Sequence, residues 1–201
     1  MTSEGRTFIE EARRAQIIAC AIEVLADQGY AHTTLARIAR QAKISTGVIS
    51  YHFGGKQQLI EAVVAEVARL ATDLMVPRIL AQPTATEALR AYLESNLDFM
   101  REHRKPLLAL MEIITHMPGE EGGPGPYAAQ AEVAVADLEK VLGWGQQSGE
   151  FRDFDRRSMA VTIRAAVDAV PSRIVHEPGL DLDLLARELV TTFTLATRRQ
   201  S

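Results

Sequence analysis

The segment from residue 33 to residue 56 reads TTLARIARQAKISTGVISYHFGGK and carries the clearest structural signals in the chain. Thr33-Thr34 and, further on, Ser45 are good helix N-caps, so each is predicted to start a short helix. The glycines Gly54-Gly55 end the second helix. Helical spacing predicts an apolar core made of Leu35, Ile38, Ala39, Ile44, Ile49 and Phe53. Two short helices joined by a tight turn have the size of a helix-turn-helix unit.

The second short helix carries side chains that suit contact with DNA. In a helix-turn-helix unit this helix lies in the major groove and presents its first and its outward residues to base edges. Small hydroxyl groups and a glycine at its start permit close approach, and a lysine at the start of the next helix favours a phosphate. The candidate DNA contacts are Thr34, Arg37, Ser45, Thr46, Gly47, Val48, Ser50, Tyr51, His52 and Lys56.

Alternatives stay open for several of these residues. Arg37 and Arg40 are either phosphate contacts or part of a solvated face. Tyr51 and His52 either contact DNA or only complete the end of a helix.

The same segment resembles the DNA-binding signature of the TetR family of transcriptional regulators. The matching positions are Thr33-Thr34, Ile38-Ala39, Ser45-x-Gly47, Tyr51-His52-Phe53 and Lys56. The preceding helix, which ends in DQGY, is similar to the first helix of the family. The resemblance covers roughly residues 11–71, and Ser45–Ser50 is closest to the betaine-repressor branch. That local likeness does not transfer a ligand.

The segment departs from the family pattern at two positions. Lys43 stands in the turn between the short helices, where the family usually has glycine. If that turn needs a positive φ, lysine costs about 1 kcal/mol. Ser50 stands where a tyrosine is usual, so a phosphate contact through that phenol is not implied here.

Charge is unevenly spread along the chain, whose net charge is −4. Residues 1–56 hold seven Lys or Arg and five Asp or Glu, a net charge of +2, whereas the remainder holds 15 and 21, a net charge of −6. No acidic residue stands between Asp27 and Glu61. This acid-free window is either a binding face for a polyanion or merely a solvated basic face.

The rest of the chain has helical periodicity and no period-2 strands, so we predict an all-α fold of about nine helices. A helix that is apolar nearly all round, and therefore buried on all sides, is expected over 107–117. A flexible loop is expected over 118–126, and a helix that Pro171 kinks is expected over 155–176. The predicted domains are a three-helix DNA-binding domain, 1–56, whose signature extends to about 71, and a second helical domain, 57–201.

Composition excludes several classes of protein. The one cysteine, Cys20, rules out a disulfide framework and a cysteine-based metal site. No stretch approaches the roughly 18 apolar residues of a membrane span, and the N-terminus lacks the apolar run of a signal peptide, so we expect a cytoplasmic protein. Neither G-x-S-x-G nor H-E-x-x-H occurs, and Ser50 and Gln57 break a phosphate-loop pattern. We therefore expect no enzyme, catalytic residue, metal or cofactor.

The resemblance implies that the second domain binds a small-molecule effector and forms a homodimer. In the family the last two helices, here about 155–176 and 181–198, pair with their two-fold copies, which implies a pseudo-palindromic operator. Effector candidates are large or polar residues on otherwise apolar faces: Phe99, His103, Met111, Glu112, His116, Trp144, Met159 and Asp168.

The effector candidates also have simpler interpretations. For Phe99, Met111 and Met159 the interpretation as plain core is favoured over an effector contact. Glu112 and His116 stand four residues apart and either bond one another, face a polar pocket or reach solvent.

These observations lead to one main functional hypothesis and one alternative. The main hypothesis is a repressor that a small molecule releases from double-stranded operator DNA. The alternative is an all-helical protein–protein adaptor that has kept the small domain and no longer reads DNA; the acid-free window and the intact second short helix argue against it.

Overall fold

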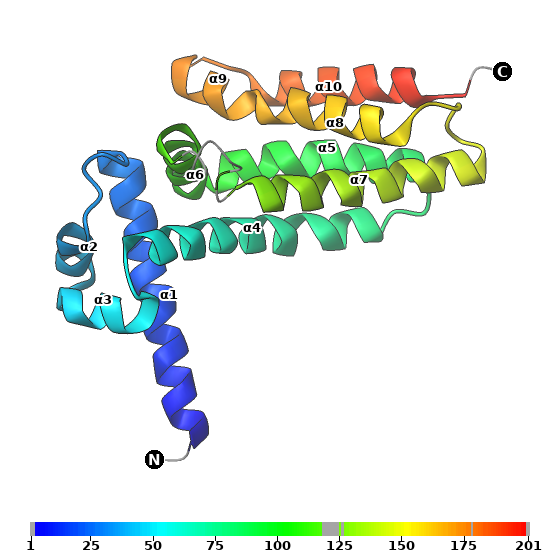
Figure 1. Ribbon diagram of the computed structural model, residues 1–201. Helices are drawn as coiled ribbons and strands as arrows, with labels where there is room; N and C mark the ends of the chain where they lie inside the picture. The colour runs from blue at the N-terminus through cyan, green and yellow to red at the C-terminus, as the bar shows by residue number, and fades with distance from the viewer. Residues whose placement is uncertain (1–2, 118–124, 126, 178, 200–201) are drawn as a thin grey trace. The chain divides into compact units, whose positions relative to one another are not determined.

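The structure, a computed structural model, describes residues 3–117, 125, 127–177 and 179–199, with side chains from residue 8 onward. Within these residues the regular elements are ten helical segments and one isolated bridge, between Phe151 and Arg198 (Figure 1). The helices are α1 (Ser3–Gln28), α2 (Leu35–Ala42), α3 (Thr46–Phe53), α4 (Lys56–Leu80), α5 (Ala85–Glu102), α6 (Arg104–His116), α7 (Ala128–Ser148), α8 (Arg156–Asp168), α9 (Val170–His176) and α10 (Leu182–Thr197). The predicted all-α fold is confirmed.

The expected kink at Pro171 appears as a break between two helices. The predicted helix over 155–176 is divided at Ala169 into α8 and α9, with Pro171 in the first turn of α9. Proline has no backbone N–H to donate, so it is favoured in the first turn of a helix, where no helical carbonyl needs that N–H. The count of about nine helices therefore becomes ten segments in the described residues.

The chain forms two compact units. The N-terminal unit comprises residues 1–68 and 105–127, and the C-terminal unit comprises residues 69–104 and 128–201. The first unit thus includes the start of α4 and nearly all of α6, in addition to the predicted DNA-binding segment. A functional boundary between residues 56 and 57 stays a prediction.

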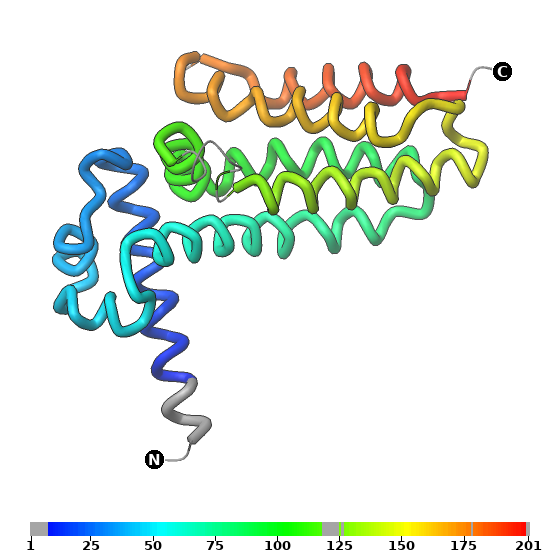
Figure 2. The backbone as a smooth tube through the Cα atoms, in the orientation of Figure 1, coloured from blue at the N-terminus to red at the C-terminus, as the bar shows by residue number. Residues whose placement is uncertain are grey.

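In the N-terminal unit, α1 packs on α2 and α2 packs on α3, as the blue and cyan segments of Figure 2 show. The fully buried side chains at this junction include Ile17, Leu25, Ile38 and Ile49. Of the predicted core residues, Leu35 and Ile44 are only half-buried, and the others are buried.

One burial prediction in this unit is wrong. Helix α6 was expected to be buried on all sides, but only Leu107, Ala109 and Ile113 are buried, and Ile114 is exposed. Ala109 and Ile113 stand four residues apart and share a face, whereas Leu107 lies on another side near the start of the helix. The apolar composition of α6 therefore does not translate into burial all round. The predicted loop 118–126 lies, except for Gly125, outside the described residues.

In the C-terminal unit, α5 packs on both α7 and α10, and α7 packs on α8 (Figure 1). The side chains that fill this core include Leu89, Leu93, Leu97, Leu138, Leu142, Ile163 and Val167. Across the described parts of the chain, no helix combines the length and the apolar character needed to cross a bilayer.

Candidate nucleic-acid interface

The two threonines before α2 have separate roles. The Thr34 side chain accepts a hydrogen bond from the Arg37 N–H at 3.2 Å and so caps the helix. Thr33 is fully buried, and its hydroxyl donates to the Gly29 carbonyl at 2.8 Å. Thr34 therefore starts α2, whereas Thr33 ties that start to the end of α1.

The turn between α2 and α3 has the positive φ that the sequence left conditional. Lys43 has φ 55° and ψ 44°, a left-handed conformation, and its N–H approaches the Arg40 carbonyl at 3.2 Å. The next residue, Ile44, donates to the Ala39 carbonyl at 3.0 Å, which closes the end of α2.

Helix α3 begins at a capped and exposed end. Ser45 has extended backbone angles, and its hydroxyl oxygen accepts from the Val48 N–H at 3.4 Å. A Cβ at Gly47 would meet only the Ser45 Oγ, at 3.6 Å, so the fold leaves open space beside this glycine. Within α3, Ile49 and Phe53 face the core, whereas the predicted contacts Thr46, Gly47, Ser50 and Tyr51 are exposed and Val48 and His52 are half-buried.

The far end of α3 is held by a residue that the sequence analysis did not single out. The Arg14 guanidinium donates to the His52 carbonyl and lies 4.3 Å from the centre of the Phe53 ring. Nearby on α1, Gln16 donates to the Ala42 carbonyl at 3.2 Å. Nothing in the local pattern of α1 distinguishes Arg14 and Gln16 from ordinary surface residues, because their partners lie 38 and 26 residues away, respectively.

The basic side chains around α3 are free of acidic neighbours. Arg37 donates to the Gln28 side chain at 2.8 Å, and the Lys56 Nζ lies 4.3 Å from the centre of the Tyr30 ring. Burial lowers the pKa of Lys56 from its ordinary value. Among the described residues, no carboxylate lies within ion-pair distance of Arg37, Arg40, Lys43 or Lys56. This surface is therefore open to an external anion.

Glu112 and His116, two predicted effector residues, lie in the N-terminal unit. Glu112 accepts a hydrogen bond from the Tyr30 N–H at 2.8 Å, and the His116 ring stacks on the Tyr30 ring with centroids 6.0 Å apart. The His116 Nδ1 lies 3.5 Å from the Glu112 Oε2. Of the open alternatives, the two side chains do approach one another, and they do so against the segment that follows α1.

The remaining effector candidates are divided between the units. Met111, on α6, is half-buried in the N-terminal unit. In the C-terminal unit, the rings of Phe99 and His103 stack with centroids 4.8 Å apart. Met159 is half-buried and Trp144 is 38% exposed, and neither joins that stack. Among the eight candidates, Glu112 thus lies beside His116 in the N-terminal unit and Phe99 beside His103 in the C-terminal unit.

Asp168 belongs to a polar cluster within the C-terminal unit. It pairs with Arg164, whose side chain is only 11% exposed. Arg164 also donates to the Tyr92 hydroxyl at 3.0 Å and to the Asn96 Oδ1 at 3.2 Å, which links α8 to α5. Nothing in the local sequence around Tyr92 and Asn96 indicates this partner, because Arg164 lies 72 and 68 residues away. In the described part of the chain, no group of three His, Cys, Asp or Glu side chains could hold a metal.

Comparison with known proteins supports the helix-turn-helix interpretation. Residues 17–63 match the model of the family "Bacterial regulatory proteins, tetR family". The HTH-type transcriptional regulator BetI 1 from Chromohalobacter salexigens is 34% identical over 115 residues, which make up 55% of this chain and 56% of that protein. The chain spans about half the length of the curated relatives it matches.

Solved structures share the whole fold at lower identity. AibR, solved in complex with isovaleryl coenzyme A and operator DNA, superposes with a TM-score of 0.74 at 21% identity, over 90% of this chain and 97% of its own. A protein from Saccharomonospora viridis in complex with choline reaches a TM-score of 0.80 at 22% identity, over 94% and 99% of the two chains. These likenesses concern the fold. Over residues 17–63, the helix-turn-helix segment of this chain is similar to that of the tetR family of bacterial regulatory proteins.

Proposed function

We propose that the chain is a homodimeric transcriptional repressor that binds a pseudo-palindromic operator and is released from it by a small molecule. The observation that carries the proposal is the exposed face of α3, which presents Thr46, Gly47, Ser50 and Tyr51 beside basic side chains without acidic neighbours. A polyanion with readable base edges is the partner that fits such a face. Because that partner is genomic DNA, the proposal places the protein in the cytoplasm.

The proposed contacts divide by chemistry. Thr46, Gly47, Val48, Ser50 and Tyr51 contact base edges, since they project from the start and outward side of α3. Phosphate oxygens are bound by side chains or N–H groups at Thr34, Arg37, Ser45, His52 and Lys56. The phosphate contacts supply affinity and the base contacts supply sequence preference.

The dimer rests on exposed apolar residues of the last helices. Val161 on α8 and Leu184 and Leu195 on α10 are 46%, 49% and 60% exposed in the single chain. Burying such residues against a two-fold copy is favourable by about 25 cal/mol for each Å² removed from water. Two copies of α3 in one dimer then require a half-site repeated with two-fold symmetry.

The effector acts through unequal affinity for two arrangements of the dimer. A small molecule lowers DNA affinity only if it binds the released arrangement more tightly than the DNA-bound one. We propose that its site includes Phe99, His103, Trp144, Met159 and Asp168 of the C-terminal unit. Choline and a coenzyme A thioester differ in charge and size, so the structural relatives do not name the effector.

A salt titration of DNA binding tests the proposal. The full-length protein is mixed with labelled DNA from upstream of its own coding region, and the dissociation constant is measured from about 50 to 200 mM salt. A dimer with six to ten phosphate contacts should lose about 10³-fold or more in affinity over that range. The absence of a specific site in upstream or pooled genomic DNA, together with a flat salt dependence, would contradict the proposal and favour the adaptor alternative.

Two variants at exposed positions, one on α3 and one on α7, make the titration specific. Tyr51 is 76% exposed, so Tyr51→Ala should weaken binding while the unfolding curve stays unchanged. Val133 on α7 is 60% exposed and lies in the C-terminal unit, so Val133→Ala should leave DNA affinity as it is. If the two variants bound DNA with equal affinity, α3 would not be part of the DNA interface.

A further inference from the structure

Lys43 holds a backbone conformation that lysine rarely adopts. Its φ is 55°, and it is the one residue other than glycine with a positive φ in the described chain. The other positive-φ positions there are Gly29, Gly54 and Gly149. In this conformation Cβ crowds the backbone, so the turn would be more stable with glycine.

The side chain of Lys43 does not stabilise the fold, so it does not explain the strained backbone. Lys43 is exposed, and within the described residues its ammonium group has no hydrogen-bond or ion-pair partner. The bonds that close the turn run from the backbone N–H of Lys43 and of Ile44 to carbonyls of α2. Glycine would keep both bonds and remove the strain.

The position of Lys43 suits a contact with a phosphate. It stands two residues before Ser45, the N-cap of α3, so its charge lies next to the end of the helix that would enter the groove. Arg40 and Arg37 precede it on α2, and no acidic residue lies between Asp27 and Glu61 in the sequence. Lysine provides a point charge on a flexible stem, which tolerates the variable position of a backbone phosphate.

We propose that Lys43 binds a phosphate of the operator from the turn between α2 and α3, and that this contact is why a strained lysine stands where glycine would be more stable. The inference rests on the proposed function and adds a contact to it. Residues in unfavourable backbone conformations cluster at functional sites, because only a functional gain offsets their cost.

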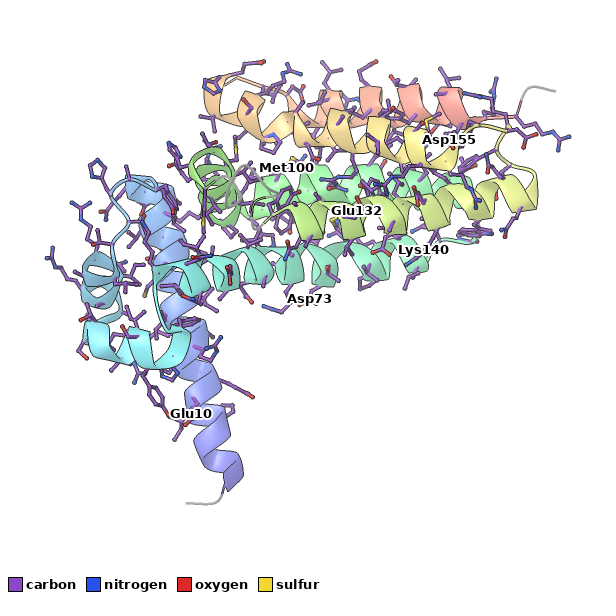
Figure 3. All side chains as sticks on the ribbon, in the orientation of Figure 1. Glu10, Asp73, Met100, Glu132, Lys140 and Asp155 are labelled. Atoms are coloured by element: carbon purple, nitrogen blue, oxygen red, sulfur yellow. The ribbon has the colours of Figure 1, made fainter. Side chains whose placement is uncertain are left out.

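Three variants separate strain from charge. Lys43→Gly removes both the strain and the charge, Lys43→Asn removes the charge and tolerates the left-handed conformation, and Lys43→Arg keeps the charge. Lys140 on α7 of the C-terminal unit is an exposed lysine, labelled in Figure 3, and Lys140→Gln serves as the matched charge control. For each protein we would measure the unfolding midpoint, the affinity for the site found with the wild type, and its salt dependence.

The expected results run in opposite directions for stability and for binding. Lys43→Gly should raise the unfolding midpoint by about 2–4 °C. It should also weaken DNA binding about three- to tenfold near 0.1 M salt and reduce the slope of log K against log[salt] by about one per subunit. Lys43→Asn should weaken binding to the same degree, whereas Lys43→Arg and Lys140→Gln should bind like the wild type.

The failures of this inference and of the proposed function are distinguishable. If the wild type binds with a steep salt dependence and Lys43→Gly binds equally well with the same slope, Lys43 makes no phosphate contact. If Lys43→Gly binds DNA more weakly but is no more stable than the wild type, the claim that lysine lowers stability at this position is wrong. A wild type without specific, salt-dependent DNA binding would overturn the proposed function and this inference together.

Discussion

The end of α1 and the end of α7 use the same structural device. Each helix is followed by a glycine with φ 78°, Gly29 in the N-terminal unit and Gly149 in the C-terminal unit. At each end a glutamate then accepts backbone N–H groups of a neighbouring segment: Glu112 of α6 accepts from Tyr30, and Glu150 accepts from the first turn of α5. Each unit thus joins two helices through one carboxylate.

The two junctions differ in the number of bonds. Glu150 accepts from the N–H groups of Ala85 and Thr86 at 3.1 and 3.0 Å and from the hydroxyls of Thr86 and Ser148 at 2.7 and 2.9 Å. Among the described residues, the Glu112 carboxylate accepts one hydrogen bond, from the Tyr30 N–H, and its Oε2 lies 3.5 Å from the His116 Nδ1. The α7–α5 junction is therefore the stronger one, and the contact of α6 with the end of α1 is the one that a modest change in α6 would break.

The largest expected effect is the loss of the stronger junction. Glu150→Ala removes the acceptor of four donors. Two of them are backbone N–H groups at the start of α5, where no helical carbonyl can replace the carboxylate. We expect the free energy of unfolding to fall by about 2–3 kcal/mol, measured by urea denaturation at pH 7. If Glu150→Ala lost less unfolding free energy than the Glu112 variant described below, the ranking of the two junctions would be reversed.

The contribution of Glu150 should also depend on pH. Burial raises the pKa of Glu150, but hydrogen bonds from Thr86, Ala85 and Ser148 together lower it below the ordinary value of 4.5. The carboxylate therefore stabilises the fold above pH 4.5, and this stability is lost as the pH falls through the lower pKa of the folded state. The stability difference between the wild type and Glu150→Gln should narrow on acidification; a constant difference would contradict the assignment.

An intermediate effect is expected at the glycine of the weaker junction. A Cβ at Gly29 would require a left-handed alanine and would stand 3.1 Å from the Glu112 Oε2. We expect Gly29→Ala to destabilise the protein by about 1–2 kcal/mol, from backbone strain and displacement of that carboxylate. At Gly149 a Cβ would meet only the Arg199 Nη1, at 3.5 Å, so the control Gly149→Ala should carry the strain alone and cost less. Equal losses of stability would show that Glu112 moves aside freely.

The smallest expected effect is the change of charge at the weaker junction. Glu112→Gln keeps an acceptor for the Tyr30 N–H but removes its charge, so the free energy of unfolding should fall by about 0.5–1 kcal/mol. Hydrogen exchange measured by NMR should show reduced protection of the Tyr30 amide and unchanged protection of the Thr86 amide. Unchanged exchange at Tyr30 would mean that the single bond contributes nothing to the junction.

Local signals in the sequence were sufficient for the helix-turn-helix. The caps Thr34 and Ser45 and the positive φ at Lys43 go with interactions among residues at most five apart. The predicted burial of α6 was wrong at Ile114. Apolar composition sets how much surface can be buried, whereas the packing partners decide which face of the helix is buried. The roles of Arg14 and Arg164 were missed, since both depend on partners far away in the chain.

By itself, the sequence determined the all-α class, the helix-turn-helix and its outward residues, and the acid-free window beside an acidic remainder. These properties depend on periodicity, capping and charge, which act along a short stretch of chain. Only the tertiary structure decided that Glu112 and His116 meet Tyr30, that Arg164 joins α8 to α5, and that Glu150 accepts from the start of α5. Each of these contacts joins residues more than 60 positions apart, where only the packing of whole helices determines which polar groups meet.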